Sequence, residues 1–171
     1  MAHDEQYRLR SGLTIVSEQS EQLEEMLAQL QQKIPANFIL LVDVTGQVVT
    51  TKGDIGKHNL VMLGSLVAGD LAASQEIARL TGEYQDFQIV LREGQDSHIF
   101  IAEAGPYMAM LIQVNNDVPL GWARMLIRQS GEEIAQVLTM PAQEEPEWDL
   151  HAGEDDLSDL FEDALDDVWL E

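Results

Sequence analysis

Apolar residues recur at helical spacing in three stretches of this chain. From Ser17 to Pro35 they follow one another at intervals of three or four residues, which predicts an amphipathic helix with Ser17 as its N-cap and Pro35 as its stop. A second helix is predicted over Leu60–Glu83, with Gly82 as the C-cap that ends it. A third helix is predicted over Leu120–Thr139.

Strand patterns fill the segments between these helices. Phe38–Val42 is a continuous apolar run, typical of a strand buried on both faces, and Gln47–Thr51 follows a Thr-Gly turn as its return strand. Three more strands are predicted at Gln85–Arg92, Ser97–Glu103 and Tyr107–Val114. The resulting order, α-β-β-α-β-β-β-α, predicts an α+β domain in which helices cover both faces of a five-stranded antiparallel sheet.

Small residues form two adjacent rows on the second predicted helix. The rows are Gly64, Ala68 and Ala72, and Ser65, Gly69 and Ala73. Glycine inside a helix is less favourable than alanine by about 1 kcal/mol, so another helix or a backbone segment is expected to approach this surface closely. Either the helix packs tightly on its own sheet, or the small residues form a face for a second chain. We favour the second chain.

Charged residues are distributed unevenly along the chain. The net charge of the 171 residues is −22, and residues 141–171 contain 13 acidic residues and no basic one. We therefore expect an N-terminal arm (1–16), one domain (17–140) and an acidic linker and tail (141–171) that is disordered when free. So acidic a chain repels nucleic acid and anionic lipid headgroups, which makes a basic protein surface the expected partner.

The acidic tail also carries an apolar helical stripe. Its large members, predicted to dock on a partner, are Leu157, Leu160, Phe161, Leu165 and Trp169. A groove with a basic rim would suit this stripe, because the opposite face is almost wholly Asp and Glu. The competing interpretation is a solubilising tail, which gains nothing from Phe161 and Trp169.

Signals for catalysis are missing from the sequence. The segment from Gly53 to His58 has two residues between its glycines, whereas a phosphate-binding loop needs four and a Ser or Thr after its lysine. The four histidines are scattered without metal-ligand spacing, and there is no cysteine. We expect neither a metal, nor a cofactor, nor enzymatic activity. Without a signal peptide or an apolar run of about 20 residues, the expected compartment is the cytoplasm, with no membrane contact.

Four stretches of the chain, together with the predicted order of elements, resemble the roadblock/dynein light chain family. They are FILLVDVTGQVV, LGSLVAGDLAASQEIARLTGE, MAMLIQV and PLGWAR. The similarity runs over roughly residues 18–139 and is strongest to the bacterial MglB-like branch, in which acidic, apolar C-terminal extensions also occur.

This resemblance implies a homodimer and a partner. Roadblock domains pair their third strands across a two-fold axis, which would place Phe87, Ile89 and Leu91 at the seam and the second helices side by side. MglB-like proteins bind a Ras-like small GTPase of the MglA type. As dimers they accelerate its GTP hydrolysis by ordering the GTPase's own switch residues, without an arginine finger, and cell polarity or motility is the expected process.

Two other functions stay open. Roadblock proteins also act as scaffolds or adaptors of small GTPases and motor complexes without changing any rate, and α+β domains of this size also serve as small-molecule sensors. For the tail, the expected destinations are the dimer's own surface or the GTPase near its nucleotide.

Overall fold

The computed structural model describes residues 6–83 and 87–139. The helices are α1 (Ser17–Lys33), α2 (Leu60–Thr81) and α3 (Leu120–Thr139). The strands are β1 (Tyr7–Arg8), β2 (Thr14–Ile15), β3 (Ala36–Asp43), β4 (Val48–Gly53), β5 (Ile89–Glu93), β6 (Ser97–Glu103) and β7 (Met108–Asn115). From α1 onward, the order of elements is the predicted one.

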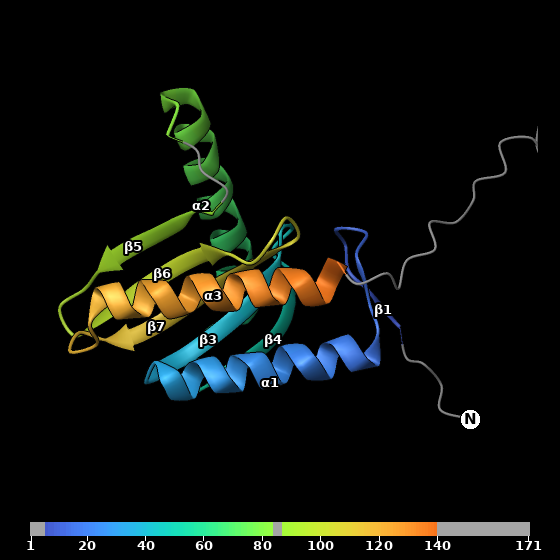
Figure 1. Cartoon of the computed structure of the whole chain (residues 1–171), viewed down its shortest axis with the longest axis horizontal. Helices are drawn as coiled ribbons and strands as arrows, with labels where there is room; N and C mark the ends of the chain where they lie inside the picture. Colours follow the sequence, from blue (N-terminus) through green and yellow to red (C-terminus); the bar gives the residue numbers. More distant parts are fainter. Residues whose placement is uncertain (1–5, 84–86, 140–171) are drawn as a thin grey trace, which may run out of the picture. The chain divides into compact units, whose positions relative to one another are not determined.

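Five strands form one antiparallel sheet in the order β4-β3-β7-β6-β5. Helices α1 and α3 lie side by side across one face, whereas α2 lies apart from them (Figure 1) and packs on the other face. The predicted α+β architecture with helices on both faces is therefore confirmed.

The two-sided burial of the central strands explains the unbroken apolar run of β3. Ile39 and Leu41 pack into the core beneath α1 and α3, while Leu40 and Val42 pack on the α2 side. Because successive side chains of a strand point to opposite faces, a strand covered on both sides needs an apolar residue at every position. Strand β7 follows the same rule over residues 108–112.

The N-terminal segment belongs to the same core. This differs from the predicted separate arm (1–16), because Leu9, Leu13 and Ile15 are at most 5% exposed and pack in the cluster beneath α1 and α3. Strands β1 and β2 form a two-stranded hairpin that brings these residues there. Each strand has only two residues, which is too short for a recognisable alternation in the sequence.

Helix α1 begins one residue earlier than predicted. Ser17 is its first helical residue, and Val16 is the N-cap. Since valine offers no side-chain acceptor, the end is held instead by Gln19, whose Oε1 accepts from the Val16 N–H at 3.1 Å. The Nε2 of Gln19 donates to the carbonyl of Val137 at 2.9 Å, so this buried glutamine also joins α1 to α3. The predicted C-cap at Gly82 is confirmed, with φ of 73°.

Candidate functional site

Helix α2 has a side that packs on the sheet, here called the packed side. It consists of Gly64, Val67, Leu71 and Ala78, which are all buried. At Gly64 the helix meets the β3–β4 turn so closely that a Cβ would lie 2.3 Å from the carbonyl oxygen of Gly46. The small size of Gly64 is thus explained by the protein's own backbone, and our second-chain interpretation is wrong for this residue.

The β3–β4 turn that meets Gly64 is held by Asp43. Its Oδ1 accepts from the N–H of Thr45 at 3.0 Å, the hydroxyl of Thr45 at 2.7 Å and the N–H of Gln47 at 2.8 Å. Its Oδ2 accepts from the N–H of Ser11 at 3.2 Å, which ties the N-terminal hairpin to the turn. Burial alone would raise the pKa of Asp43, but these hydrogen bonds outweigh it, so the pKa lies below the usual value.

The opposite side of α2, here called the open side, is apolar and exposed. Its members recur at spacings of three and four: Met62, Leu66, Gly69, Ala73, Ile77 and Leu80. The four large side chains are 60–79% exposed. A Cβ on Gly69 would meet nothing within 4 Å. Large apolar side chains gathered on one exposed helix face are typical of a binding surface.

Strand β5 adjoins this surface and forms an edge of the sheet. Arg92 of β5 reaches Asp70 of α2 in a two-point ion pair, with Nη1 donating to Oδ2 at 2.8 Å and Nη2 donating to Oδ1 at 2.9 Å. This pairing lowers the pKa of Asp70 and raises the pKa of Arg92. The ion pair therefore links the edge strand to the helix.

A groove of about 490 Å³ lies between α2 and the sheet at this edge. Leu66 and Gly69 line it from the helix, Ile99 and Ile101 from β6, and the Asp70–Arg92 pair also borders it. The groove is thus continuous with the open side and the edge strand. The three features together form the candidate site, which can hold an apolar helix or a strand of another protein.

The structure separates the two predicted rows of small residues. Ala68 and Ala72 line a second cavity at the end of the sheet, on a different side from the groove. Ser65 and Gly69 line the groove, and Ala73 is exposed on the open side. Only the second row, without the first, contributes to the candidate site.

Of the three predicted seam residues, only Ile89 and Leu91 belong to the edge strand β5. Phe87 precedes β5, whose residues run from Ile89 to Glu93. Phe87, Ile89 and Leu91 pack against the core beneath α1 and α3, which leaves Val90 and Arg92 to face α2. The seam itself stays a prediction.

The sequence analysis did not identify several residues of the site. Leu66, Ile77 and Leu80 repeat at helical spacing beside Gly69 and Ala73, which was a readable signal, but only the small residues of this stripe were predicted. The Asp70–Arg92 pair had no local signal, because its partners are 22 positions apart. The predicted docking residues Leu157, Leu160, Phe161, Leu165 and Trp169 lie outside the described residues.

Over residues 6–83 and 87–139, no group of three or more His, Asp or Glu side chains could hold a metal ion. Within the same ranges, α2 is the one helix with the length and apolar content to cross a membrane. Its packed side lies on the sheet, however, and its apolar excess belongs to the open side.

Comparisons with known proteins agree with this geometry. Residues 22–114 match the family model of the Roadblock/LC7 domain. The chain is 27% identical to the gliding protein MglB of Thermus thermophilus, with a TM-score of 0.65, over 72% of this chain and 93% of that one. It is 25% identical to Myxococcus xanthus MglB, with a TM-score of 0.63, over 68% and 94% of the two chains.

A third similar structure is described as MglB with a tetrameric arrangement; the identity is 26% and the TM-score 0.65, over 72% of this chain and 93% of that one. No curated protein sequence matches the chain significantly. The family match extends from α1 to β7 and covers more than half of the 171 residues. The chain therefore belongs to the Roadblock/LC7 domain family, and its relatives include MglB proteins.

Proposed function

We propose that this protein is a cytoplasmic, homodimeric regulator that binds a Ras-like small GTPase of the MglA type and stimulates its GTP hydrolysis. The observation that carries the proposal is the open side of α2, with its row of exposed apolar side chains next to the edge strand β5. The class of partner is the one that the resemblance to MglB-like proteins implies, and the similarity to solved MglB structures supports that resemblance.

Self-association uses the edge strand and the groove. Within residues 6–83 and 87–139, no strand pairs with the outer side of β5, and a second copy of β5 could extend the sheet there. The open side of α2 would then lie beside its symmetry mate, where Gly69 and Ala73 allow two helices to approach closely. One of the similar MglB structures is described as tetrameric, which supports association between copies.

Stimulation would come from positioning, since the described residues offer no catalytic constellation. A paired set of α2 helices gives the GTPase a rigid, mainly apolar platform. Binding energy at this platform would hold the switch segments of the GTPase in their hydrolytic arrangement, so the GTPase would supply its own catalytic residues. The acidic character of the chain favours a GTPase with a basic rim around its contact surface.

Single-turnover GTP hydrolysis by a Ras-like GTPase from the same genome tests the proposal. The GTPase is titrated with the full-length chain, and complex formation is measured in parallel by sedimentation. The rate is expected to rise and to saturate near two chains per GTPase. An unchanged rate in spite of a complex would replace the activator with a scaffold, and the absence of a complex would overturn both.

A further inference from the structure

Main-chain hydrogen bonds to β6 hold strand β5 at both ends. Just before the strand, the N–H of Glu103 donates to the carbonyl of Gln88 at 3.0 Å. Just after it, the N–H of Gly94 donates to the carbonyl of Ser97 at 3.0 Å. Residues 88 and 94 therefore turn their main-chain groups toward β6, and the register between the two strands is regular.

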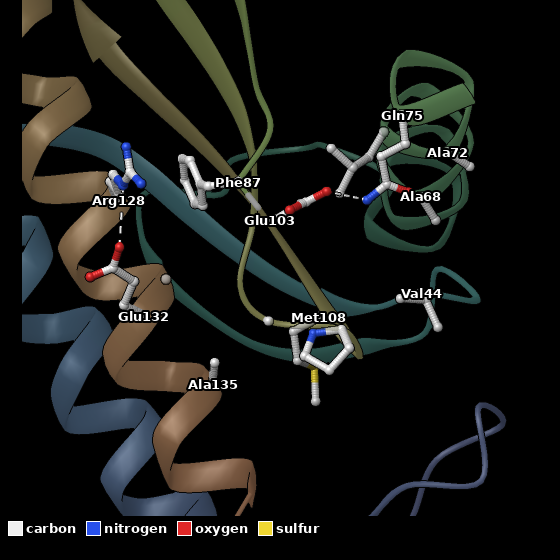
Figure 2. Close-up of a pocket in the computed structure, with 14 residues that line it drawn as sticks. Val44, Ala68, Ala72, Gln75, Phe87, Glu103, Met108, Arg128, Glu132 and Ala135 are labelled. Atoms are coloured by element: carbon white, nitrogen blue, oxygen red, sulfur yellow. Dashed lines mark hydrogen bonds and ion pairs between the residues drawn. The ribbon is translucent and has the colours of Figure 1, made fainter. Parts of the chain in front are cut away.

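Side chains on the two faces of the sheet also hold this strand. Figure 2 shows the ring of Phe87 directed toward Arg128 of α3, whose guanidinium lies 5.7 Å from the centre of the ring. On the other face, Arg92 makes its two-point ion pair with Asp70 of α2. Strand β5 is thus a preformed edge, so little order is lost when another strand pairs with it.

The main-chain groups that face outward from β5 follow from these contacts. Along a strand, the N–H and C=O of successive residues point alternately to its two sides. Since residues 88 and 94 face β6, the groups of Ile89, Leu91 and Glu93 point to the outer side. In the described part of the chain no strand pairs there. A second copy of β5 that extends the sheet must therefore use these residues.

Two antiparallel copies of β5 related by a two-fold axis can pair in more than one register. Opposite residues must point to the same face, so the axis passes through a residue and not between two. An axis at Leu91 pairs Leu91 with its own mate, and Ile89 with Glu93 of the second copy. Every outward-facing residue of β5 then has a partner. An axis at Val90 or at Arg92 leaves one of them without a partner in β5.

The side chains on the α2 face favour the same register. Val90 and Arg92 both lie on that face. An axis at Arg92 would place two guanidinium groups opposite each other, and like charges directly opposite on neighbouring strands are destabilising. With the axis at Leu91, Arg92 lies opposite Val90 of the second copy. Its methylene groups can pack on that apolar side chain while the guanidinium keeps its ion pair with Asp70.

We propose that two copies of this chain pair through β5 with Leu91 on the two-fold axis, and that Arg92 selects the partner strand from its place opposite Val90 of the second copy. This pairing rests on the proposed function, whose self-association surface it specifies. A strand that presents a basic residue opposite Arg92 is rejected, so the edge discriminates copies of this chain from such strands.

Single cysteines test the register, because the chain has no cysteine of its own. Full-length Leu91→Cys and Val90→Cys are oxidised with copper phenanthroline, and covalent dimers are quantified on non-reducing gels. In a hydrogen-bonded pair the Cα atoms are about 5.5 Å apart, within the range of about 4.4–6.8 Å that a disulfide spans, so Leu91→Cys should link. The two copies of position 90 are displaced by about 7 Å along the strands, so Val90→Cys should not link.

Met125→Cys on α3 is the control for random collisions, because Met125 is 57% exposed on the other face of the sheet. It should give few covalent dimers. Urea unfolding of reduced Leu91→Cys checks its fold. Covalent dimers from Val90→Cys in place of Leu91→Cys, or equal yields from Met125→Cys, would overturn the register.

A charge pair at position 90 tests the role of Arg92 without any change at Leu91. Val90→Lys places a like charge opposite Arg92 of the second copy, whereas Val90→Glu places an opposite charge there. Because this contact occurs twice in the dimer, Val90→Lys should self-associate at least about fivefold more weakly than Val90→Glu. Equal association of the two variants, measured by sedimentation velocity, would contradict the selection by Arg92.

Sedimentation of the wild-type chain separates failure of this register from failure of the proposed function. A monomeric wild type would overturn the register and the proposed homodimer together. Association with a different linking pattern would overturn the register alone. Stimulation of GTP hydrolysis is measured in its own assay with the wild-type chain, so it stands or falls independently of the cysteine variants.

Discussion

Gly64 and Gly69 lie on the same helix, five residues apart, and are small for different reasons. Gly64 faces inward, where the carbonyl of Gly46 would be 2.3 Å from an added Cβ. Gly69 faces outward, where an added Cβ would meet nothing within 4 Å. The comparison separates the packed side of α2, which serves the fold, from the open side, which offers a surface to another chain.

The difference shows why a stripe of small residues is an ambiguous signal. Close approach of a backbone explains Gly64 completely, and no partner is needed there. On the open side, by contrast, Gly69 is an exposed glycine within a helix, which lowers stability by about 1 kcal/mol relative to alanine. Four large apolar residues are exposed beside it. A partner that covers this surface would compensate for both features.

The sharpest test of the comparison exchanges each glycine for alanine. Gly64→Ala should destabilise the protein by as much as about 3 kcal/mol, because either α2 or the β3–β4 turn must move. Gly69→Ala should stabilise it by up to about 1 kcal/mol through helix propensity. Urea unfolding of both variants measures the difference, and equal effects on stability would break the distinction between the two sides.

The second largest effect concerns association through the open side. Leu66→Asp places a charge at a position that is 62% exposed, so the fold should stay intact while self-association weakens by about 2 kcal/mol, roughly 30-fold. Sedimentation velocity over a concentration series measures this change. Met125→Asp on α3 is the matched control, because Met125 is 57% exposed on the other face of the sheet. Equal weakening by both variants would show a general charge effect.

A smaller effect is expected at the turn that supports the packed side. Asp43→Asn replaces the Oδ2 acceptor of the Ser11 N–H by an NH₂ group, which should lower stability by about 1 kcal/mol at pH 7. Because the pKa of Asp43 is lowered in the folded protein, its contribution is complete above the unfolded value of 3.8 and is lost as the pH falls through the lowered pKa. Urea unfolding of both proteins from pH 7 down to pH 3 should therefore show a narrowing gap, and a constant gap would contradict the role of the charge.

The smallest effect belongs to the ion pair beside the groove. Arg92 is half exposed, so solvent screens the pair and Asp70→Asn should cost only about 0.5 kcal/mol at neutral pH. The lowered pKa of Asp70, caused first by the hydrogen bonds from Arg92, means that this contribution is complete above the unfolded value of 3.8 and is lost as the pH falls through the lowered pKa. Thermal unfolding at low and high salt provides the measurement. A salt-independent difference would argue against an ionic origin.

Much of the fold could be predicted because the hydrophobic pattern of each helix and strand lies within one short stretch of the sequence. The bounds of α3 and β6 are the predicted ones, and the apolar run of β3 predicted its two-sided burial. The N-terminal hairpin could not be recognised, because Leu9 and Leu13 become core residues through pairings of only two residues per strand.

The candidate site was only partly accessible from the sequence. Helical spacing placed Ser65, Gly69 and Ala73 on one stripe, but it could not tell which stripe the sheet covers. That choice depends on the contact between Gly64 and Gly46, which no local pattern encodes. The second cavity, which Ala68 and Ala72 line, is built by five separated segments, so it is a property of the tertiary structure alone.

The central claim is that the open side of α2 is the surface through which this protein regulates a GTPase. Single-turnover GTP hydrolysis by the Ras-like GTPase, measured with the wild-type chain, Leu66→Asp and Met125→Asp at equal concentrations, tests it most directly. The account predicts that the wild type and Met125→Asp accelerate hydrolysis equally and that Leu66→Asp loses most of the acceleration. Full acceleration by Leu66→Asp would contradict the account.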